Sequence, residues 1–478
     1  MMSRNPIHTM RSAAGLLRLA LFIAICVNFT SASEPFSPGD RVCFVGDSIT
    51  HGGSYHGNIY LYYATRFPSR RFEAFNCGVS GGNTNGAIAR VPTDILIHQP
   101  TVATIMLGMN DVGRQYYANG PDLASDEINR AKAIDSYAKN LRALATGLKS
   151  SGARLIFITP SIFDQTAVFT KAEDPYYAGP DAVGVNTGLG LIAQTVRDVA
   201  AEFSSPLVDF HRPMTRINLE QQRQDPSFTL VGQDRVHPGT VGHFVMSYLF
   251  LKEQGIPKNV NRVVIDAAAG KYVELSNSHL TNLSTDPTSA SFTLTSEALP
   301  FPISPDVAPA LKLVPFMAEM NQEHLQVTGL NPGVYDLLID GESIKSLGSE
   351  ELATGINCAE FMNTPQYRQA VRVMQINKSR MTMISEKLRS LVFVEQSYLK
   401  GVDLANLSLE EKWAIIDKNV DFQKGKPWYG YCKDLCNKYK EYKPLESETL
   451  RQVEAITREM WETAAPKPHA YLIRPKAR

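Results

Sequence analysis

The sequence predicts an α/β fold in which helices cover both faces of a parallel sheet. Short apolar runs at residues 42–45, 72–75, 102–107, 155–159 and 206–210 alternate with amphipathic stretches such as 134–150 and 190–203. Continuously apolar runs are typical of strands buried on both faces, and strand–helix alternation favours parallel pairing. Right-handed connections would bring the carboxyl ends of the strands to one edge, where such sheets bind their ligands.

The chain of 478 residues is longer than one hydrophobic core usually supports, so we expect several domains. The α/β pattern predicts a first domain over residues 34–257. Residues 258–347 are richer in Ser, Thr and Pro and contain strand-like pieces. One of these pieces ends at Asp340-Gly341, a typical hairpin turn, and this segment predicts a small β module.

Residues 348–478 predict a helical C-terminal region of unknown role. Thr364 is a candidate N-cap followed by proline at the first helical position. A capping box begins at Ser408, and a last amphipathic helix is expected over residues 447–463.

Residues 1–33 predict a secretory signal peptide. Three arginines precede an apolar run over residues 19–27, and small residues suited to a signal peptidase follow it. The alternatives are an uncleaved anchor, for which the run is short, and a lipid anchor through Cys26. We therefore expect a secreted or periplasmic protein with no stable membrane span after cleavage.

Composition argues against several partners. Lys+Arg and Asp+Glu each number 48, so bulk charge gives no reason to expect nucleic acid or an anionic membrane as a partner. Five cysteines follow the leader, and an odd number leaves at least one thiol unpaired. Cys432 and Cys436 lack further ligands at metal-binding spacing, which favours packing or a local bridge over a metal site.

Four short polar clusters fall within the α/β region. The tripeptide Gly46-Asp47-Ser48 directly follows the first strand, so the Ser48 hydroxyl can face a cleft, although such tripeptides also occur in surface turns. Residues 76–84 follow the second strand, and their small side chains let backbone N–H groups approach a ligand closely.

The third and fourth clusters carry an amide and a carboxylate–imidazole pair. Asn110 follows the third strand and can donate to a developing oxyanion, although Asn-Asp also forms simple turns. Asp234 lies three residues before His237, so its carboxylate can bond the Nδ1–H of the imidazole. The Nε2 atom is then free to take a proton from a serine.

In this order, the four clusters resemble the conserved blocks of the SGNH (GDSL-like) hydrolase superfamily, over about residues 41–255. The resemblance implies a flavodoxin-like three-layer α/β/α domain with all four blocks after strands. It implies Ser48 as the nucleophile and His237 as the general base and then acid. Asp234 would orient the imidazole and stabilise its charged form.

The resemblance also implies an oxyanion hole. Its donors would be the N–H groups of Ser48 and Gly81 and the side-chain amide of Asn110. Gly82 is an alternative to Gly81 because the two glycines adjoin. The chemistry requires neither a metal nor an organic cofactor.

The implied reaction is hydrolysis of a carboxylic ester on a small molecule or glycan, with an acetyl group on a polysaccharide as the best substrate hypothesis. The alternatives are a lipase, thioesterase or acyltransferase with the same triad, and an inert carbohydrate-binding protein.

Two further interpretations stay open in the sequence. Residues 78–82 fit the Gly-x-Ser-x-Gly nucleophile elbow, which would make Ser80 the nucleophile. This alternative leaves the clusters at Ser48 and Asn110 unexplained. His51, Tyr55 and His56 follow Ser48 and could line the cleft or be structural.

Overall fold

The computed structural model describes residues 33–118, 123–169, 175–403 and 406–477. The predicted leader therefore lies outside the described residues except for Ser33. Within the described ranges, none of the helices combines the length and apolar character needed to cross a bilayer.

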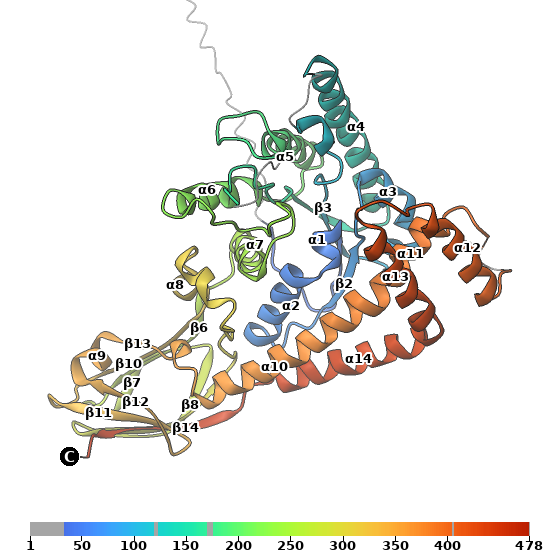
Figure 1. The fold of residues 1–478 in the computed structure, drawn as a ribbon. Helices are drawn as coiled ribbons and strands as arrows, with labels where there is room; N and C mark the ends of the chain where they lie inside the picture. Colours follow the sequence, from blue (N-terminus) through green and yellow to red (C-terminus); the bar gives the residue numbers. More distant parts are fainter. Residues whose placement is uncertain (1–32, 119–122, 170–174, 404–405, 478) are drawn as a thin grey trace, which may run out of the picture.

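The predicted parallel sheet is present, and its strand order is β2-β1-β3-β4-β5 (Figure 1). This order is the flavodoxin-like one, so the prediction of fold class is confirmed. The strands are β1 (Arg41–Gly46), β2 (Glu73–Gly78), β3 (Val102–Met106), β4 (Arg154–Ile158) and β5 (Leu207–Val208). The helices are α1 (Ser48–His51), α2 (Ser54–Arg66), α3 (Thr84–Arg90), α4 (Leu123–Ser150), α5 (Val185–Glu202), α6 (His211–Gln222) and α7 (Thr240–Glu253), with shorter turns η1 (Val91–Ile95), η2 (Leu96–His98) and η3 (Arg114–Tyr117).

Strand β1 is apolar from Val42 to Val45 because both of its faces are buried. Val42 and Phe44 point to one face and pack in a core that includes residues of α2 and α7. Cys43 and Val45 point to the other face and pack in a core with residues of α4 and α5. All four side chains are fully buried, because helices cover both faces of a parallel sheet.

The chain after α7 forms two sheets, with strand orders β13-β10-β6-β7 and β12-β11-β14-β9-β8, in which β14 (Pro468–Pro475) comes from the C-terminal region. At the predicted hairpin, Asp340 and Gly341 both have positive φ (51° and 82°) between β11 and β12. The elements are β6 (Asn259–Asp266), β7 (Lys271–Ser276), β8 (Ser278–Asp286), β9 (Ser289–Ser296), η4 (Ala308–Lys312), α8 (Phe316–Met320), β10 (Gln322–Thr328), β11 (Val334–Ile339), β12 (Glu342–Gly348), α9 (Ser349–Thr354), β13 (Ile356–Asn357) and η5 (Cys358–Glu360).

The C-terminal region is mainly helical, as predicted. Thr364 and Ser408 are N-caps, and Ser408 forms the predicted capping box. The elements are α10 (Pro365–Thr382), η6 (Met383–Leu388), α11 (Arg389–Tyr398), α12 (Leu409–Asp421), α13 (Tyr429–Tyr442), η7 (Lys443–Leu445), α14 (Glu446–Thr463) and β14 (Pro468–Pro475). Strand β14 was not predicted from the sequence; it returns to the β module and pairs between β11 and β9.

Helices α10 and α14 connect the two ends of the molecule. They run side by side beneath the α/β domain, from the β module to the cluster formed by α11, α12 and α13 (Figure 1). All five described cysteines are free and buried, so Cys432 and Cys436 pack within that cluster and form no local bridge.

Glu323 is a buried carboxyl group where the β module meets α10. Its Oε1 accepts from Gln366 Nε2 at 2.8 Å, and burial raises its pKa from 4.5 to about 7. The folded protein thus holds this proton more tightly than the unfolded chain. The contribution of Glu323 to the free energy of unfolding is therefore fully present below about pH 4.5, and it is lost as the pH rises to about 7.

We expect Glu323→Gln to stabilise the fold by about 3 kcal/mol at alkaline pH and to have little effect at acidic pH. Urea unfolding of both proteins at the two pH values measures the difference. Glu319→Gln is the control, because Glu319 pairs at the surface with Lys252 (2.8 Å) and should give no gain. An increase in the free energy of unfolding of Glu323→Gln that is the same at both pH values would contradict this explanation.

Candidate active site

Ser48, His237 and Asp234 form a continuous hydrogen-bonded line. Ser48 Oγ lies 2.8 Å from His237 Nε2, and His237 Nδ1 lies 2.5 Å from Asp234 Oδ2. Ser48 is the first residue of α1, directly after β1. The structure thus brings together three side chains that are up to 189 positions apart.

The Asp234 carboxylate is held ionised. Desolvation opposes its charge, but hydrogen bonds from the His237 side chain and from the backbone N–H groups of Val236 and His237 prevail and lower the pKa of Asp234 to about 2. The side chains of His237 and Asp234 are 51% and 53% exposed, so the imidazole faces solvent and can be reached by a substrate.

The fourth block does not directly follow a strand, which corrects the expectation from the sequence. It lies in a loop between α6 and α7, closed by the bridge between Val231 and Pro238. Arg235 adopts a positive φ of 66° and donates to Asp164 O (2.6 Å) and Ala167 O (3.1 Å). A closed loop with a buried arginine anchor, and not a strand end, positions His237.

The structure distinguishes the two adjacent glycines of the second block. The N–H of Gly82 is already used, since it donates to Val79 O at 2.8 Å. The N–H of Gly81 has no acceptor among the described residues, and Gly81 has a φ of +70°, which favours glycine. Gly81 is therefore the better of the two candidates for an oxyanion donor.

Asn110 lies beside the same loop, after β3. One hydrogen of its side-chain amide donates to Gly82 O at 2.9 Å, and Arg114 donates to its Oδ1 at 3.5 Å. An amide nitrogen carries two hydrogens, so a second donor remains. The first bond fixes the amide plane and joins the third block to the second.

The residue directly before Ser48 and three residues that follow it are buried in the protein interior. Asp47 is buried and caps α1 by accepting from Ile49 N at 3.0 Å, and burial raises the pKa of Asp47 to about 6. His51, Tyr55 and His56 are buried as well, so these three do not line an open cleft. Their role in this structure is packing, as shown by the contacts of Tyr55 and His56 with each other and with Phe44 of β1.

Ser80 has a different kind of partner. Its Oγ accepts from Tyr431 Oη at 2.8 Å, while the imidazole of His237 bonds Ser48. Among the described residues, no histidine or carboxylate is bonded to Ser80 Oγ, so the Gly-x-Ser-x-Gly alternative lacks the adjacent base that it requires. Tyr431 belongs to α13, and no motif in the sequence indicated that the C-terminal region reaches this loop.

Comparisons with known proteins decide the family. A model of the GDSL-like lipase/acylhydrolase family matches residues 44–244. A solved structure of a gut microbial diltiazem-metabolizing enzyme is 31% identical, with 94% of this chain and 100% of that chain covered and a TM-score of 0.81. The chain belongs to the GDSL-like lipase/acylhydrolase family.

A second relative is shorter than this GDSL-like protein. An acetylxylan esterase from Geobacillus stearothermophilus is 26% identical over 232 residues, which are 45% of this chain and 94% of that relative. This GDSL-like protein is a hydrolase of ester bonds. It shares its β module and C-terminal helices with the full-length relative, whereas the esterase match spans less than half of the chain.

Proposed function

We propose that this GDSL-like hydrolase is a serine esterase whose nucleophile is Ser48. The observation that carries the proposal is the line from Ser48 Oγ through the imidazole of His237 to the ionised carboxylate of Asp234. This arrangement is the one that makes a serine hydroxyl nucleophilic.

The reaction proceeds in two halves. Ser48 Oγ attacks the ester carbonyl while His237 Nε2 takes its proton, and Asp234 stabilises the imidazolium. His237 then gives the proton to the leaving alcohol, which leaves an acyl group on Ser48. Water, deprotonated by the same imidazole, attacks the acyl group, and the carboxylic acid departs as Ser48 regains its proton.

The negative charge that develops on the carbonyl oxygen needs donors already in place. We assign this role to the N–H groups of Ser48 and Gly81 and the free amide hydrogen of Asn110. This assignment is supported by the N–H of Gly81, which has no acceptor among the described residues, and by the fixed amide plane of Asn110. Such preorganised donors are typically worth on the order of a hundredfold or more each in kcat.

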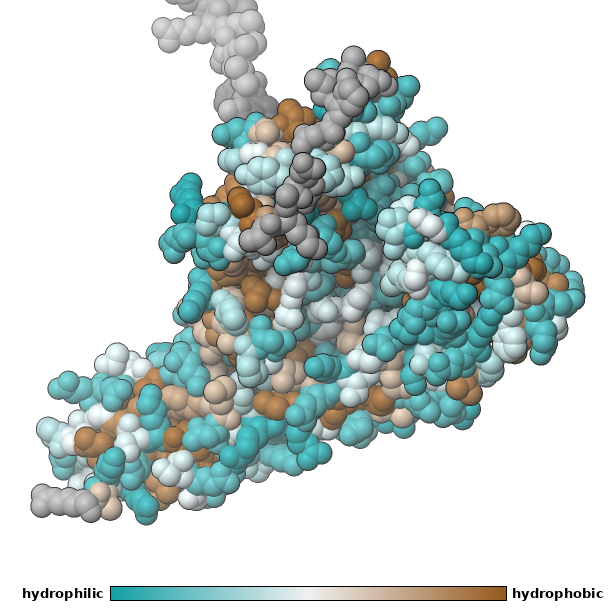
Figure 2. Space-filling view, in the orientation of Figure 1, coloured by the Kyte–Doolittle hydropathy of each residue, from teal (hydrophilic) through white to brown (hydrophobic). Residues whose placement is uncertain are grey.

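The proposed substrate is an acetyl ester on a polysaccharide or oligosaccharide, met by an exported enzyme. The acetylxylan esterase relative supports an acetyl group on a glycan. Polar and charged groups lie near the nucleophile: Asp47 precedes it in the chain, and Arg114 interacts with both Asp47 and Asn110. Figure 2 shows a face on which hydrophilic residues predominate and hydrophobic residues form separate patches, which favours a polar substrate over a lipid surface.

Acyl-chain preference tests the substrate class. We expect acetate release from acetylated xylooligosaccharides, and kcat/KM for an aryl acetate at least about tenfold above that for the matching dodecanoate or palmitate. Diltiazem is a further substrate to test, because it is named for the full-length relative. A preference for long acyl chains would refute the glycan proposal and favour a lipase. No reaction of Ser48 with a fluorophosphonate would indicate an inert binding protein.

A further inference from the structure

The loop that carries Gly81 is held by the C-terminal region at three consecutive residues. The carbonyl of Gly78 accepts from Arg389 Nε at 3.0 Å. The side chain of Val79 is buried in the hydrophobic cluster of the C-terminal helices. Ser80 Oγ accepts from Tyr431 Oη at 2.8 Å. These partners lie more than 300 positions away, on α11 and α13.

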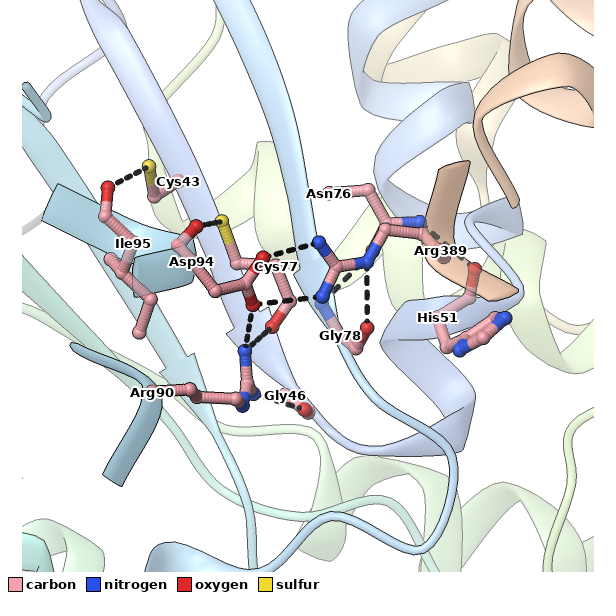
Figure 3. A network of polar contacts seen from close by, with 10 residues as sticks. All are labelled: Cys43, Gly46, His51, Asn76, Cys77, Gly78, Arg90, Asp94, Ile95 and Arg389. Carbon is pink, nitrogen blue, oxygen red and sulfur yellow. Dashed lines mark hydrogen bonds and ion pairs between the residues drawn. The ribbon is translucent and has the colours of Figure 1, made fainter. Parts of the chain in front are cut away.

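The first of these contacts belongs to a buried ionic cluster (Figure 3). Arg389 donates to both carboxylate oxygens of Asp94, at 2.6 and 2.9 Å. Arg90 donates to the same carboxylate at 2.6 Å. The three side chains are at most 5% exposed. Burial opposes the ionisation of Asp94, yet the two guanidinium groups prevail and lower its pKa to about 2.

The guanidinium group of Arg90 also donates to carbonyl groups near the ends of β1 and β2. Arg90 bonds Cys77 O at 2.6 Å and Gly46 O at 3.1 Å. Gly46 is the last residue of β1, two positions before Ser48. Buried guanidinium groups are costly unless their N–H donors are satisfied, so these carbonyls are tightly held. One cluster thus bonds the strand ends that lead to the nucleophile and to the oxyanion loop.

The contacts at Val79 and Ser80 hold the next part of the loop. Val79 is 6% exposed and shares its cluster with Leu391 and Phe393 of α11. Phe393 also packs edge-on against Tyr431, with ring centroids 6.1 Å apart. The Tyr431 ring is half exposed, so its hydroxyl bond to Ser80 lies at the surface of the molecule.

Gly81 itself makes no comparable contact with the described part of the chain. A Cβ atom built on Gly81 would meet no heavy atom of the described residues within 4 Å. Glycine, here at a φ of +70°, can adopt several backbone arrangements because it has no side chain. The direction of the Gly81 N–H therefore depends on its neighbours: on residues 78–80, and on the bond from Gly82 N to Val79 O.

We infer that the C-terminal helices complete the active site by fixing the loop at residues 78–82, with Arg389 and Tyr431 as positioning residues for the Gly81 N–H. The inference rests on the proposed function, since it gives the Gly81 N–H a role in binding the oxyanion. Misaligned donors weaken binding of the transition state more than binding of the substrate. Loss of the anchors thus lowers kcat and leaves KM nearly unchanged.

Arg389→Lys tests the buried anchor. Lysine retains the charge beside Asp94 but cannot bond the carboxylate through two nitrogens while also reaching Gly78 O. We expect kcat to fall about a hundredfold, with KM within about threefold of its original value. Arg380→Lys is the matched control, because Arg380 is a buried arginine of α10 that bonds Ala74 O (2.9 Å), near the start of β2. The control is expected to keep kcat.

Tyr431→Phe tests the surface anchor, which is the bond from Tyr431 to Ser80. Because Tyr431 is half exposed, this variant is expected to fold even if Arg389→Lys does not. We expect kcat to fall up to about tenfold. Ser80→Ala is expected to have the same effect, and the double variant no larger one, because both remove a single bond. Tyr429→Phe, on the same helix with its hydroxyl bonded to Asp421 (3.1 Å), should keep full activity.

The outcomes separate this inference from the proposed function. Full kcat in both Arg389→Lys and Tyr431→Phe, together with an inactive Ser48→Ala, overturns the inference and leaves the esterase proposal standing. A rise in KM at unchanged kcat also overturns it, because the anchors would then act on substrate binding. An active Ser48→Ala contradicts the esterase proposal itself.

Discussion

Replacing Ser48 by alanine is expected to lower kcat for an acetate ester on the order of 10⁶-fold, to near the background rate. The Ser48 hydroxyl lies within hydrogen-bond distance of the imidazole nitrogen that is to take its proton, with Oγ and Nε2 2.8 Å apart. Without it, no acyl-enzyme can form, and the oxyanion donors alone supply only a small residual rate. Initial rates of acetate release by the purified variant measure the effect.

Ser80→Ala is the matched control for this experiment. Ser80 follows β2, as Ser48 follows β1, but its hydroxyl accepts from Tyr431 and not from a base. It should keep at least about a tenth of the activity and should still be labelled by a fluorophosphonate. Loss of labelling in Ser80→Ala, with labelling retained in Ser48→Ala, would move the nucleophile to Ser80.

Asp234→Asn is expected to have the second-largest effect, on the order of 10⁴-fold in kcat at neutral pH. The carboxylate accepts from His237 Nδ1 at 2.5 Å. It therefore fixes the tautomer that leaves Nε2 free to receive the Ser48 proton. A carboxamide can present N–H at this place, which reverses the tautomer and removes the charge opposite the imidazolium.

The loop should survive this substitution. Asp234 Oδ1 accepts from the backbone N–H groups of Val236 and His237, both at 3.0 Å, and the carbonyl oxygen of asparagine can keep both bonds. Thermal unfolding should therefore be nearly unchanged while kcat falls. Because the pKa of Asp234 is about 2, the acid limb of the wild-type rate should not reflect this group. A fall in kcat of less than about tenfold in Asp234→Asn would show that the carboxylate has little part in catalysis.

Much of the fold could be predicted because its signals are local. The apolar run of β1 revealed a strand buried on both faces, and the cap at Thr364 and the hairpin at Asp340-Gly341 fell where the residues indicated. The candidate site was found in the same way, since Ser48 and Asn110 directly follow strands whose carboxyl ends share one edge of the sheet.

Other features left no local signal. Strand β14 lies at the end of a helical region, and its place between β11 and β9 depends on pairing partners far away in the chain. The choice between Gly81 and Gly82 required knowing which N–H was already bonded in the turn. The fourth block also differed from expectation, because a buried arginine, Arg235, positions its loop.

By itself, the sequence determined the fold class, the order of the polar blocks and the residue types at the site, because periodicity, capping and turn preferences act over a few neighbouring residues. Only the tertiary structure decided which of the two glycine N–H groups, Gly81 or Gly82, has no acceptor among the described residues, and which contacts hold the loop that carries it. The bond between Arg389 and Gly78 spans 311 positions. A contact of that separation forms only when whole elements pack together, so the residues next to Arg389 or Gly78 in the sequence carry no signal for it.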